Sequence, residues 1–340
     1  MALSKEIGID LGTANILIYV KGEGIVVNEP SVVAIDDENK KPLAVGQEAK
    51  DMLGKTPGRV KAIRPLKDGV IADFRITEIL ITHFINKLNL KGIFSRPTIL
   101  ICCPSNITSI EKSAIKDVAE RCGAKRVFIE EEPKVAAVGA GLEISKPTGN
   151  MVIDIGGGTT DIAVLSLGDI VTSSSLKVAG DVMDEDIIKF VKDKYKLLIG
   201  DRTAEQIKME IGIAIKGISE ETFEVRGRDL VTGLPHTITL TADETELALR
   251  ETCQTIVRET KHVLEQTPPE LAADIIDTGI FLTGGSALFR NFEKLVHKET
   301  DLKINLPDKP DECVVRGIAK IVTEAEYGEL SYVPREKVIN

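Results

Sequence analysis

Apolar and polar residues alternate over residues 5–36, which predicts a meander of β-hairpins. The segment EIGIDLGTANILIYV reverses at a Gly-Thr-Ala-Asn turn, and the segment GIVVNEPSVVAID continues the alternation after a second turn. A more polar block with Gly and Pro at intervals follows over about residues 37–75. Beyond it, the apolar spacing predicts a helix from about Arg75 to Leu90 and a strand from Thr98 to Cys103.

The next helix has recognisable signals at both ends. Pro104-Ser105 closes the preceding strand, and either Ser105 or Thr108 can cap the helix that follows. We expect this helix to end near Cys122-Gly123.

The opening pattern returns about 140 residues further along the chain. Ile9-Asp10-Leu11-Gly12 opens the first hairpin turn, and Ile153-Asp154-Ile155-Gly156 opens a second one within MVIDIGGGTTDIAVLSLG. Such a repeat predicts two similar halves, and two similar halves usually enclose one site between them.

The second half carries an insertion of mixed character from Gly180 to about Ala242. It contains the helical stretch DRTAEQIKMEIGIAI and the hairpin-like stretch FEVRGRDLVTGLPHTITL. A long helix through Arg250 to Leu264 follows, and GIFLTGGSALFRNF then predicts a strand, a glycine turn and a helix. The last predicted helix runs from Cys313 to Glu326.

Composition and charge exclude several classes of protein. The chain has 340 residues, of which 43% are hydrophobic, so it suits two domains or one large divided domain rather than a disordered chain. Its 43 Lys and Arg against 53 Asp and Glu give a net charge of −10, which argues against a nucleic-acid partner. Without a long apolar run, and with the polar start MALSKEIGID, the chain is expected to be cytoplasmic.

Cysteine and histidine residues give no sign of a metal centre. The five cysteines include the adjacent pair Cys102 and Cys103, and none has zinc-type spacing. The four histidines lie far apart in the sequence. We therefore interpret the cysteines as small buried hydrophobic residues and expect no transition metal held by protein ligands.

Each repeated Asp-x-Gly turn is a candidate phosphate site. Consecutive backbone N–H groups of such a turn form a nest for anions, and two nests that face each other would hold a polyphosphate. Asp10 and Asp154 then lie where a carboxylate can hold Mg²⁺ through its water ligands. An ordinary hairpin is the alternative for one such turn, but the repetition favours the phosphate interpretation.

A third glycine turn, Thr283-Gly284-Gly285-Ser286, follows an apolar strand and precedes a helix. Because glycines leave the backbone uncovered, a flat base and its ribose can approach this turn closely. Together with two phosphate turns it would supply the nucleoside end of a nucleotide site.

These motifs occur in the order of a known superfamily. DLGTAN, IEEEPKVAAVGAG, DIGGGTTD and LTGGS resemble the ATPase superfamily of actin, the 70-kDa heat-shock chaperones and the sugar kinases. More closely, IGIDLGTAN, GIVVNEPSVVAID, KAIRPLKDGVIADF, VIDIGGGTTDIAVLSLG, TPPELAADI and GIFLTGG are similar to the MreB family of bacterial actins. The resemblance extends from about Ile7 to about Val322.

The resemblance implies an α/β actin-like ATPase fold of two related domains with ATP or ADP and Mg²⁺ in the cleft between them. It also implies slow hydrolysis coupled to polymerisation into paired protofilaments, on the inner face of the cell membrane, that govern bacterial cell shape or organisation. Membrane or wall-synthesis proteins are partners by family only. The implied subdomains are IA (1–31, 76–143 and 320–340), IB (32–75), IIA (144–178 and 244–319) and IIB (179–243).

The family's functional residues transfer by motif position. The implied nucleotide-binding residues of the two phosphate turns are Asp10, Gly12, Thr13, Ala14, Asn15, Asp154, Gly156, Gly157, Gly158, Thr159 and Thr160. Those at the nucleoside end are Glu205, Lys208, Gly284, Gly285 and Ser286. Asp10 and Asp154 are implied to hold Mg²⁺ through its water ligands. Glu132, with Thr159, is implied to position the water that attacks the terminal phosphate.

Several of these positions have simpler alternatives. Glu130, Glu131 and Glu132 also suit a solvated acidic stretch that caps the helix following Pro133. Glu205 and Lys208 also suit an exposed i,i+3 pair on a helix face. Ser286 replaces the family's usual third glycine, and its side chain could crowd the base.

Ile93 and Phe94 lie in a loop flanked by Lys91 and Arg96, a combination that suits a membrane surface, and the family has its membrane-inserting loop here. The alternative is that both side chains pack into the core. Burying two such side chains in lipid contributes at most about 1.5–3 kcal/mol each. We therefore expect membrane binding to follow assembly, because a filament presents many copies at once.

Two other functions of the superfamily remain open from the sequence. A small-molecule kinase usually places an aspartate base near the second phosphate turn, and Glu132 before a proline is a poor match. A chaperone-type monomeric switch continues into a hydrophobic linker, whereas the sequence here ends in the polar segment YGELSYVPREKVIN. We expect the polymerising ATPase.

Overall fold

The computed structural model describes residues 5–88, 97–105 and 107–323. The chain divides into two compact units. Unit 1 comprises Met1–Thr148, Leu165–Val171 and Glu312–Asn340, and unit 2 comprises Gly149–Val164 and Thr172–Asp311. Each unit is built around its own five-stranded sheet.

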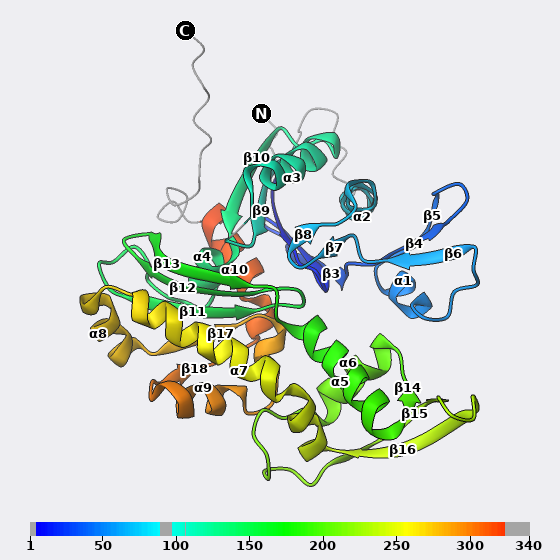
Figure 1. Ribbon diagram of the computed structural model, residues 1–340. Coiled ribbons are helices and arrows are strands. Elements are labelled where there is room, and N and C mark those ends of the chain that lie inside the picture. Colours follow the sequence, from blue (N-terminus) through cyan, green and yellow to red (C-terminus); the bar gives the residue numbers. More distant parts are fainter. Residues whose placement is uncertain (1–4, 89–96, 106, 324–340) are drawn as a thin grey trace. The chain divides into compact units, whose positions relative to one another are not determined.

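The main sheet of unit 1 has the strand order β10-β9-β1-β2-β3 (Figure 1). Its strands are β1 (Glu6–Leu11), β2 (Asn15–Val20), β3 (Gly24–Pro30), β9 (Thr98–Cys103) and β10 (Arg126–Glu131). Strands β1, β9 and β10 run parallel, with Asp10 opposite Cys102 and Cys102 opposite Glu130. The carboxyl ends of these three strands therefore meet at one edge of the sheet.

Four helices pack around this sheet. They are α2 (Phe74–Lys87), α3 (Ser109–Arg121), α4 (Glu132–Gly139) and α10 (Cys313–Thr323). Thr108 caps α3 in a capping box with Glu111, which resolves the choice between Ser105 and Thr108. The apolar faces of α2, α3 and the sheet form one core that includes Leu80, Phe84 and Ile101. Helices α4 and α10 contact the strands of the same sheet.

The polar block after the first hairpins is structured. It forms a three-stranded sheet of order β5-β4-β6 and a two-stranded sheet of β7 and β8, beside a short helix α1. Their bounds are β4 (Val33–Asp36), β5 (Pro42–Val45), α1 (Gln47–Met52), β6 (Val60–Ile63), β7 (Leu66–Lys67) and β8 (Val70–Ile71). A small core of Val32, Ala34, Ala44 and Ala49 supports it.

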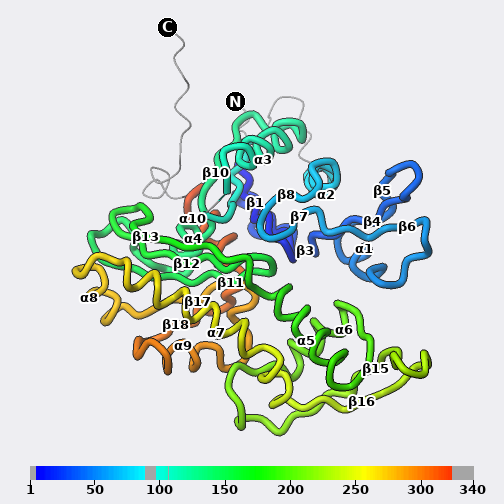
Figure 2. Tube along the Cα trace, in the orientation of Figure 1, coloured from blue at the N-terminus to red at the C-terminus, as the bar shows by residue number. Residues whose placement is uncertain are grey.

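Helices α4 and α10 lie against each other although they are far apart in the sequence, as the chain trace shows (Figure 2). Two glycines allow this approach. A Cβ on Gly139 would lie 1.8 Å from the carbonyl oxygen of Cys313, and one on Gly317 would lie 1.9 Å from that of Val135. The helix that begins at Glu132 is therefore held through backbone contact with α10.

The main sheet of unit 2 has the order β13-β12-β11-β17-β18. Its strands are β11 (Asn150–Ile155), β12 (Thr160–Ser166), β13 (Asp169–Leu176), β17 (Ile280–Thr283) and β18 (Ile304–Asn305). Strands β11, β17 and β18 run parallel. The helical elements that follow the insertion are α7 (Ala242–Gln266), α8 (Pro269–Thr278), η1 (Gly285–Leu288), α9 (Phe292–Thr300) and η2 (Pro310–Glu312).

The insertion forms two helices and a small sheet of order β14-β15-β16. Its elements are α5 (Gly180–Tyr195), β14 (Leu197–Leu198), α6 (Asp201–Ile211), β15 (Thr222–Asp229) and β16 (Pro235–Thr241). The prediction that helix continues through DRTAEQIKMEIGIAI is wrong at its end, because α6 stops at Ile211. Gly212 packs so closely on Phe289 that a Cβ would lie 2.7 Å from the ring, and Ile213 bridges to Arg290 instead.

Some expectations fall outside the described residues. Ile93 and Phe94, and the end of the last predicted helix after Thr323, are among them. The implied subdomain boundaries stay predictions. Across the ranges that the structure covers, no helix is both long and apolar enough to cross a membrane.

Candidate functional site

The first phosphate turn joins β1 to β2 in unit 1. Asp10 is nearly buried at the carboxyl end of β1, and the turn continues through Gly12, Thr13 and Ala14 to the exposed Asn15. The fully buried Ser31 holds this turn from β3's end: its hydroxyl donates to the Gly12 carbonyl at 2.7 Å, and its N–H donates to Ala14 at 2.9 Å. On the other side, the N–H of Gly69 donates to the Thr13 hydroxyl.

Asp10 and Glu132 lie at the same edge of the unit 1 sheet. Parallel register places Asp10, Cys102 and Glu130 in a row, and Glu132 begins α4 two residues later. Burial, followed by the charges of Asp10 and Glu132, raises the pKa of the Cys102 thiol. Cys102 is therefore a buried thiol that stays protonated at this edge of the sheet.

The three consecutive glutamates have different environments. Glu130 is 4% exposed, with the ammonium of Lys134 3.6 Å away, so a solvated acidic stretch is wrong for this residue. Glu131 pairs with Lys112 at 3.6 Å, and Glu132 is half-buried at the first position of α4, with Pro133 at the second. Glu132 is thus placed where the helix N-terminus meets the sheet edge that carries Asp10.

In unit 2, β11 and β17 bring the second phosphate turn and the third glycine turn (Thr283–Ser286) together. Asp154 and Thr283 are register partners, and the Thr283 hydroxyl donates to Asp154 Oδ1 at 2.7 Å. Burial raises the pKa of Asp154 to about 7, and the charge of Asp161 adds to this, although the Thr283 hydrogen bond opposes it. A desolvated carboxylate of this kind gains from a nearby cation.

The turn after Asp154 is fixed by backbone hydrogen bonds. The N–H of Gly156 donates to Thr159, which closes the turn across Gly157 and Gly158. The first N–H groups of α5 donate to the carbonyls of Gly156 and Gly157, at 3.3 and 2.8 Å. Thr159 and Thr160 are both buried where β12 begins, so the turn's conformation is set before any ligand binds.

The third glycine turn packs directly on the second phosphate turn. Gly284 has a φ of 85°, and a Cβ there would lie 2.3 Å from the carbonyl oxygen of Ile155, so the position requires glycine. Gly285 is exposed, with open space where a Cβ would stand. The Ser286 hydroxyl donates to the Gly156 carbonyl at 2.8 Å. That contact gives the hydroxyl a structural role that the sequence did not predict.

Lys208 is not part of an exposed helix face. Its ammonium pairs with Asp184 at 2.8 Å and donates to the Gly180 carbonyl, at the start of α5. The exposed-pair alternative is wrong for Lys208. Glu205, one turn earlier on α6, is half-buried and close enough to raise the pKa of Asp184.

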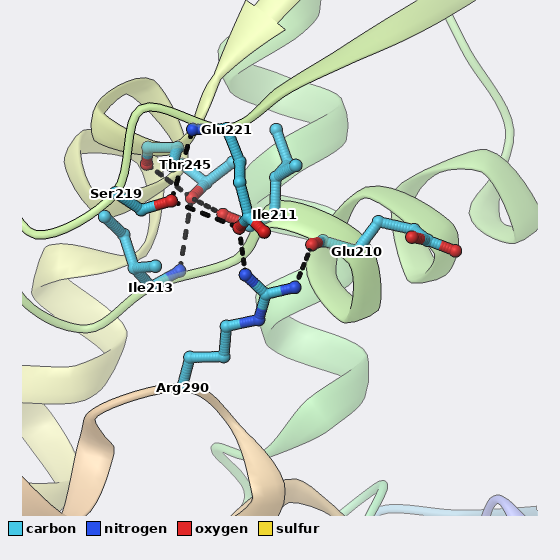
Figure 3. A network of polar contacts seen from close by, with 8 residues as sticks. Glu210, Ile211, Ile213, Ser219, Glu221, Thr245 and Arg290 are labelled. Carbon is cyan, nitrogen blue, oxygen red and sulfur yellow. Dashed lines mark hydrogen bonds and ion pairs between the residues drawn. The ribbon is translucent and has the colours of Figure 1, made fainter.

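Arg290 connects the end of α6 to the segment after the third glycine turn (Figure 3). Its guanidinium pairs with Glu221 and donates to the carbonyl of Glu210, and its own carbonyl accepts from Ala214 at 3.0 Å. The Thr245 hydroxyl bonds both Ile211 and Ile213 behind it. The elements that carry Lys208 and Gly284 are thus joined.

These side chains suit magnesium held mainly by a nucleotide. Within the part of the chain that the structure covers, no group of three or more His, Cys, Asp or Glu residues could hold a metal ion by itself. Single desolvated carboxylates such as Asp154 fit a hydrated Mg²⁺ on phosphates, since magnesium keeps most of its waters. Asp10 is the equivalent group in unit 1.

Three further residues, Ser31, Arg290 and Asp184, support the site but could not be identified from the sequence. Each lies outside the glycine motifs and acts through a partner that is distant in the sequence. Among the residues that hold the turns, only Ser286 could be singled out from the sequence, because it stands inside the LTGGS motif.

Comparison with known proteins identifies relatives over almost the entire chain. The family model described as MreB/Mbl protein matches residues 4–329. The cell shape-determining protein Mbl of Bacillus cereus is 61% identical over 92% of this chain and 94% of its own. The cell shape-determining protein MreB of Escherichia coli is 50% identical over 93% of each chain.

A solved structure matches the whole fold. The crystal structure of MreB5 of Spiroplasma citri bound to AMPPNP superimposes with a TM-score of 0.92 at 41% identity. The match covers 97% of this chain and 99% of that one. The predicted actin-like fold is confirmed by this comparison.

Proposed function

The chain belongs to the MreB/Mbl protein family, and we propose that it binds ATP with Mg²⁺, hydrolyses ATP slowly and polymerises into membrane-associated filaments that govern cell shape. The observation that carries this proposal is the pair of equivalent phosphate turns. Each follows a nearly buried aspartate at the end of a sheet strand, Asp10 in unit 1 and Asp154 in unit 2. The AMPPNP-bound relative supports a nucleotide as their ligand.

We assign the nucleotide's parts to the turns as follows. The turns Gly12–Asn15 and Gly156–Thr160 bind the phosphates, and Asp10 with Asp154 binds the waters of Mg²⁺, which would neutralise phosphate charge. Gly284, Gly285 and the start of α5 line the nucleoside end, with Glu205 and Lys208 contributing from α6. The contacts of Gly284 with Ile155, and of Lys208 with Gly180, support this division.

Hydrolysis requires a water in line with the terminal phosphate. Glu132 is the group that we propose orients this water, with Thr159 as its helper, because little else is needed for transfer to water. Its half-buried place at the start of α4, on the edge that carries Asp10, supports this role. With a single polar group orienting the water, hydrolysis should be slow, so that filaments persist for some time before hydrolysis leads to their disassembly.

Membrane attachment through Ile93 and Phe94 is proposed from the sequence alone. Two side chains give weak binding per copy, so the filament supplies the avidity. Vesicle co-sedimentation of a non-polymerising variant tests this: loss of binding is expected, and full binding would contradict the coupling to assembly.

The first experiment compares pelleting and negative-stain electron microscopy with Mg-ATP and without nucleotide. Wild type is compared with Glu132→Ala, and Glu131→Ala is the matched control because that neighbouring carboxylate pairs with Lys112. We expect nucleotide-dependent filaments in all three. Only Glu132→Ala should release phosphate more slowly and keep its filaments longer.

Two results would overturn the proposal. If no filaments form with any nucleotide while phosphate is still released, the polymer assignment fails and a kinase or monomeric switch is favoured. If Glu131→Ala slows phosphate release as much as Glu132→Ala does, the water-positioning role of Glu132 fails.

A further inference from the structure

The same carbonyl is anchored in both phosphate turns. Gly12 and Gly156 each stand two residues after the turn's aspartate, and each accepts a hydrogen bond from a serine hydroxyl. Ser31 donates to Gly12 at 2.7 Å, and Ser286 donates to Gly156 at 2.8 Å. The two serines come from unrelated places, one at the end of β3 and the other in the turn after β17. Equivalent positions in two halves therefore have equivalent supports.

An anchored carbonyl fixes the direction of the next N–H group. In a trans peptide unit the carbonyl and the N–H point in opposite directions. The N–H of Thr13 therefore points away from Ser31, and the N–H of Gly157 points away from Ser286. These are the first donors of the two proposed phosphate nests, and an anion nest depends on consecutive N–H groups that point the same way.

Glycine makes such an anchor useful. A peptide unit next to Gly12, or between Gly156 and Gly157, can rotate easily because glycine tolerates many backbone conformations. Rotation would direct a carbonyl oxygen at the phosphates in place of an N–H. In unit 2 the N–H of Gly180 also donates to Gly156, but at 3.3 Å, so the Ser286 hydroxyl makes the shorter contact.

We propose that Ser31 and Ser286 are positioning residues for the polyphosphate, each fixing the first peptide unit of one phosphate turn so that its N–H faces the ligand. This inference rests on the proposed nucleotide-binding function. It assigns Ser286 to the phosphate end of the site, although its place in the LTGGS motif suggested contact with the base. It also assigns a role to Ser31, which lies in no glycine motif.

The test measures affinities for ATP, ADP, AMP and adenosine by competition with a fluorescent ADP. Ser31→Ala and Ser286→Ala are compared with wild type and with the control Ser113→Ala, whose hydroxyl only bonds its own helix at Ser109. We expect each turn variant to weaken ATP and ADP binding about three- to tenfold, as for the loss of one hydrogen bond. Adenosine binding should change by less than about twofold.

Conservative and steric variants sharpen the result. Ser286→Thr keeps a hydroxyl and should bind ATP and ADP like wild type. Gly180→Ala should reproduce the loss, since a Cβ there would lie 2.7 Å from Ser286 Oγ and displace the hydroxyl.

A ligand-free measurement separates this inference from the proposed function. Without nucleotide, amide exchange at residues 12–14 should quicken in Ser31→Ala, and exchange at residues 156–159 should quicken in Ser286→Ala. Equal losses for adenosine and ATP, or unchanged exchange and unchanged affinities, would overturn the inference. If wild type binds no adenine nucleotide, the proposed function fails. If amide exchange in Ser31→Ala and Ser286→Ala is then also the same as in wild type, the anchoring of the turns by the two serines is refuted as well.

Discussion

The ammonium nitrogen of Lys208 lies 2.8 Å from Asp184 Oδ1 and donates to the Gly180 carbonyl at the same distance. This one side chain ties α6 to the first turn of α5, whose N–H groups hold the second phosphate turn. Both partners are mostly buried, with side-chain exposures of 15% and 10%. The ion pair is therefore a structural link beneath the proposed nucleotide site.

Asp184 should make stability depend on pH. Burial raises its pKa to about 6 from 3.8, with Glu205 and Asp181 adding to this and Lys208 opposing it. Between these two values the folded state binds more protons than the unfolded state, so Asp184 lowers stability progressively as pH rises from about 4 to 6. Well above its folded-state pKa, where Asp184 is ionised in both states, its contribution is constant.

Asp184→Asn removes this titration and measures it. The substitution also shifts the variant's free energy of unfolding by an offset that does not depend on pH. The difference in this free energy, variant minus wild type, should therefore increase by about 1–3 kcal/mol from pH 4 to pH 6. Chemical denaturation followed by circular dichroism at several pH values measures the difference. Asp169→Asn, on an exposed strand end, is the control and should follow wild type. Parallel curves for Asp184→Asn and wild type would refute the prediction.

Gly317→Ala should destabilise unit 1, although alanine is the better helix former by about 1 kcal/mol. The added Cβ would lie 1.9 Å from the carbonyl oxygen of Val135, so α10 must move away from α4. We expect a loss of at least about 2 kcal/mol, the usual result of overpacking against backbone. Because α4 begins at Glu132, phosphate release should also slow.

Gly58→Ala is the matched control, because nothing lies within 4 Å of a Cβ at that position. Thermal unfolding by circular dichroism and phosphate release are measured for both variants. A Gly317→Ala protein as stable as Gly58→Ala would mean that the two helices do not pack as described.

Local sequence patterns predicted the strands and turns because their causes are local. Asp10 and Asp154 sit in repeated apolar strands that end at glycines, and this pattern requires no knowledge of distant partners. The capping box of α3 is equally local, with Thr108 and Glu111 three residues apart.

Features that depend on distant contacts could not be predicted in this way. The helical pattern of α6 continues beyond Ile211, whereas the helix stops where Phe289 packs on Gly212 and Thr245 and Arg290 bond the backbone. Glu130 looked solvated because nothing in IEEEP shows that its strand pairs with β9, where Glu130 lies opposite Cys102. Ser31 escaped notice since its partner turn is 19 residues away.

Substitutions of Glu130 and Glu132 should have different effects, the first on thermal stability and the second on phosphate release. Glu130→Gln weakens the buried ion pair with Lys134, whose side chain is 12% exposed, so thermal stability should fall. Glu132→Gln changes a half-buried group and should leave the unfolding midpoint within about 2 °C of wild type. Its phosphate release should nevertheless be the slower of the two. The opposite assignment of stability and turnover would contradict both roles.

Arg290 should control the order of the segment after α6. Its guanidinium contacts Glu221 and the Glu210 carbonyl at once, a geometry that a planar fork achieves and an ammonium does not. Both Arg290→Ala and Arg290→Lys should therefore increase hydrogen exchange over residues 211–221. The global unfolding midpoint should change little, because the pair with Glu221 is 39% and 52% exposed.

Arg226→Ala provides the comparison for Arg290, since Arg226 pairs with Glu224 on the nearby strand β15 and both side chains are largely exposed. Exchange over residues 211–221 should stay at the wild-type rate in this variant. If Arg290→Lys instead exchanges as slowly as wild type over residues 211–221, a positive charge is sufficient, and the planar shape of the guanidinium is not required. If instead both Arg290 variants exchange faster and also bind adenosine more weakly, the order of this segment contributes to the nucleoside end of the site, because the same arginine stands four residues after Ser286.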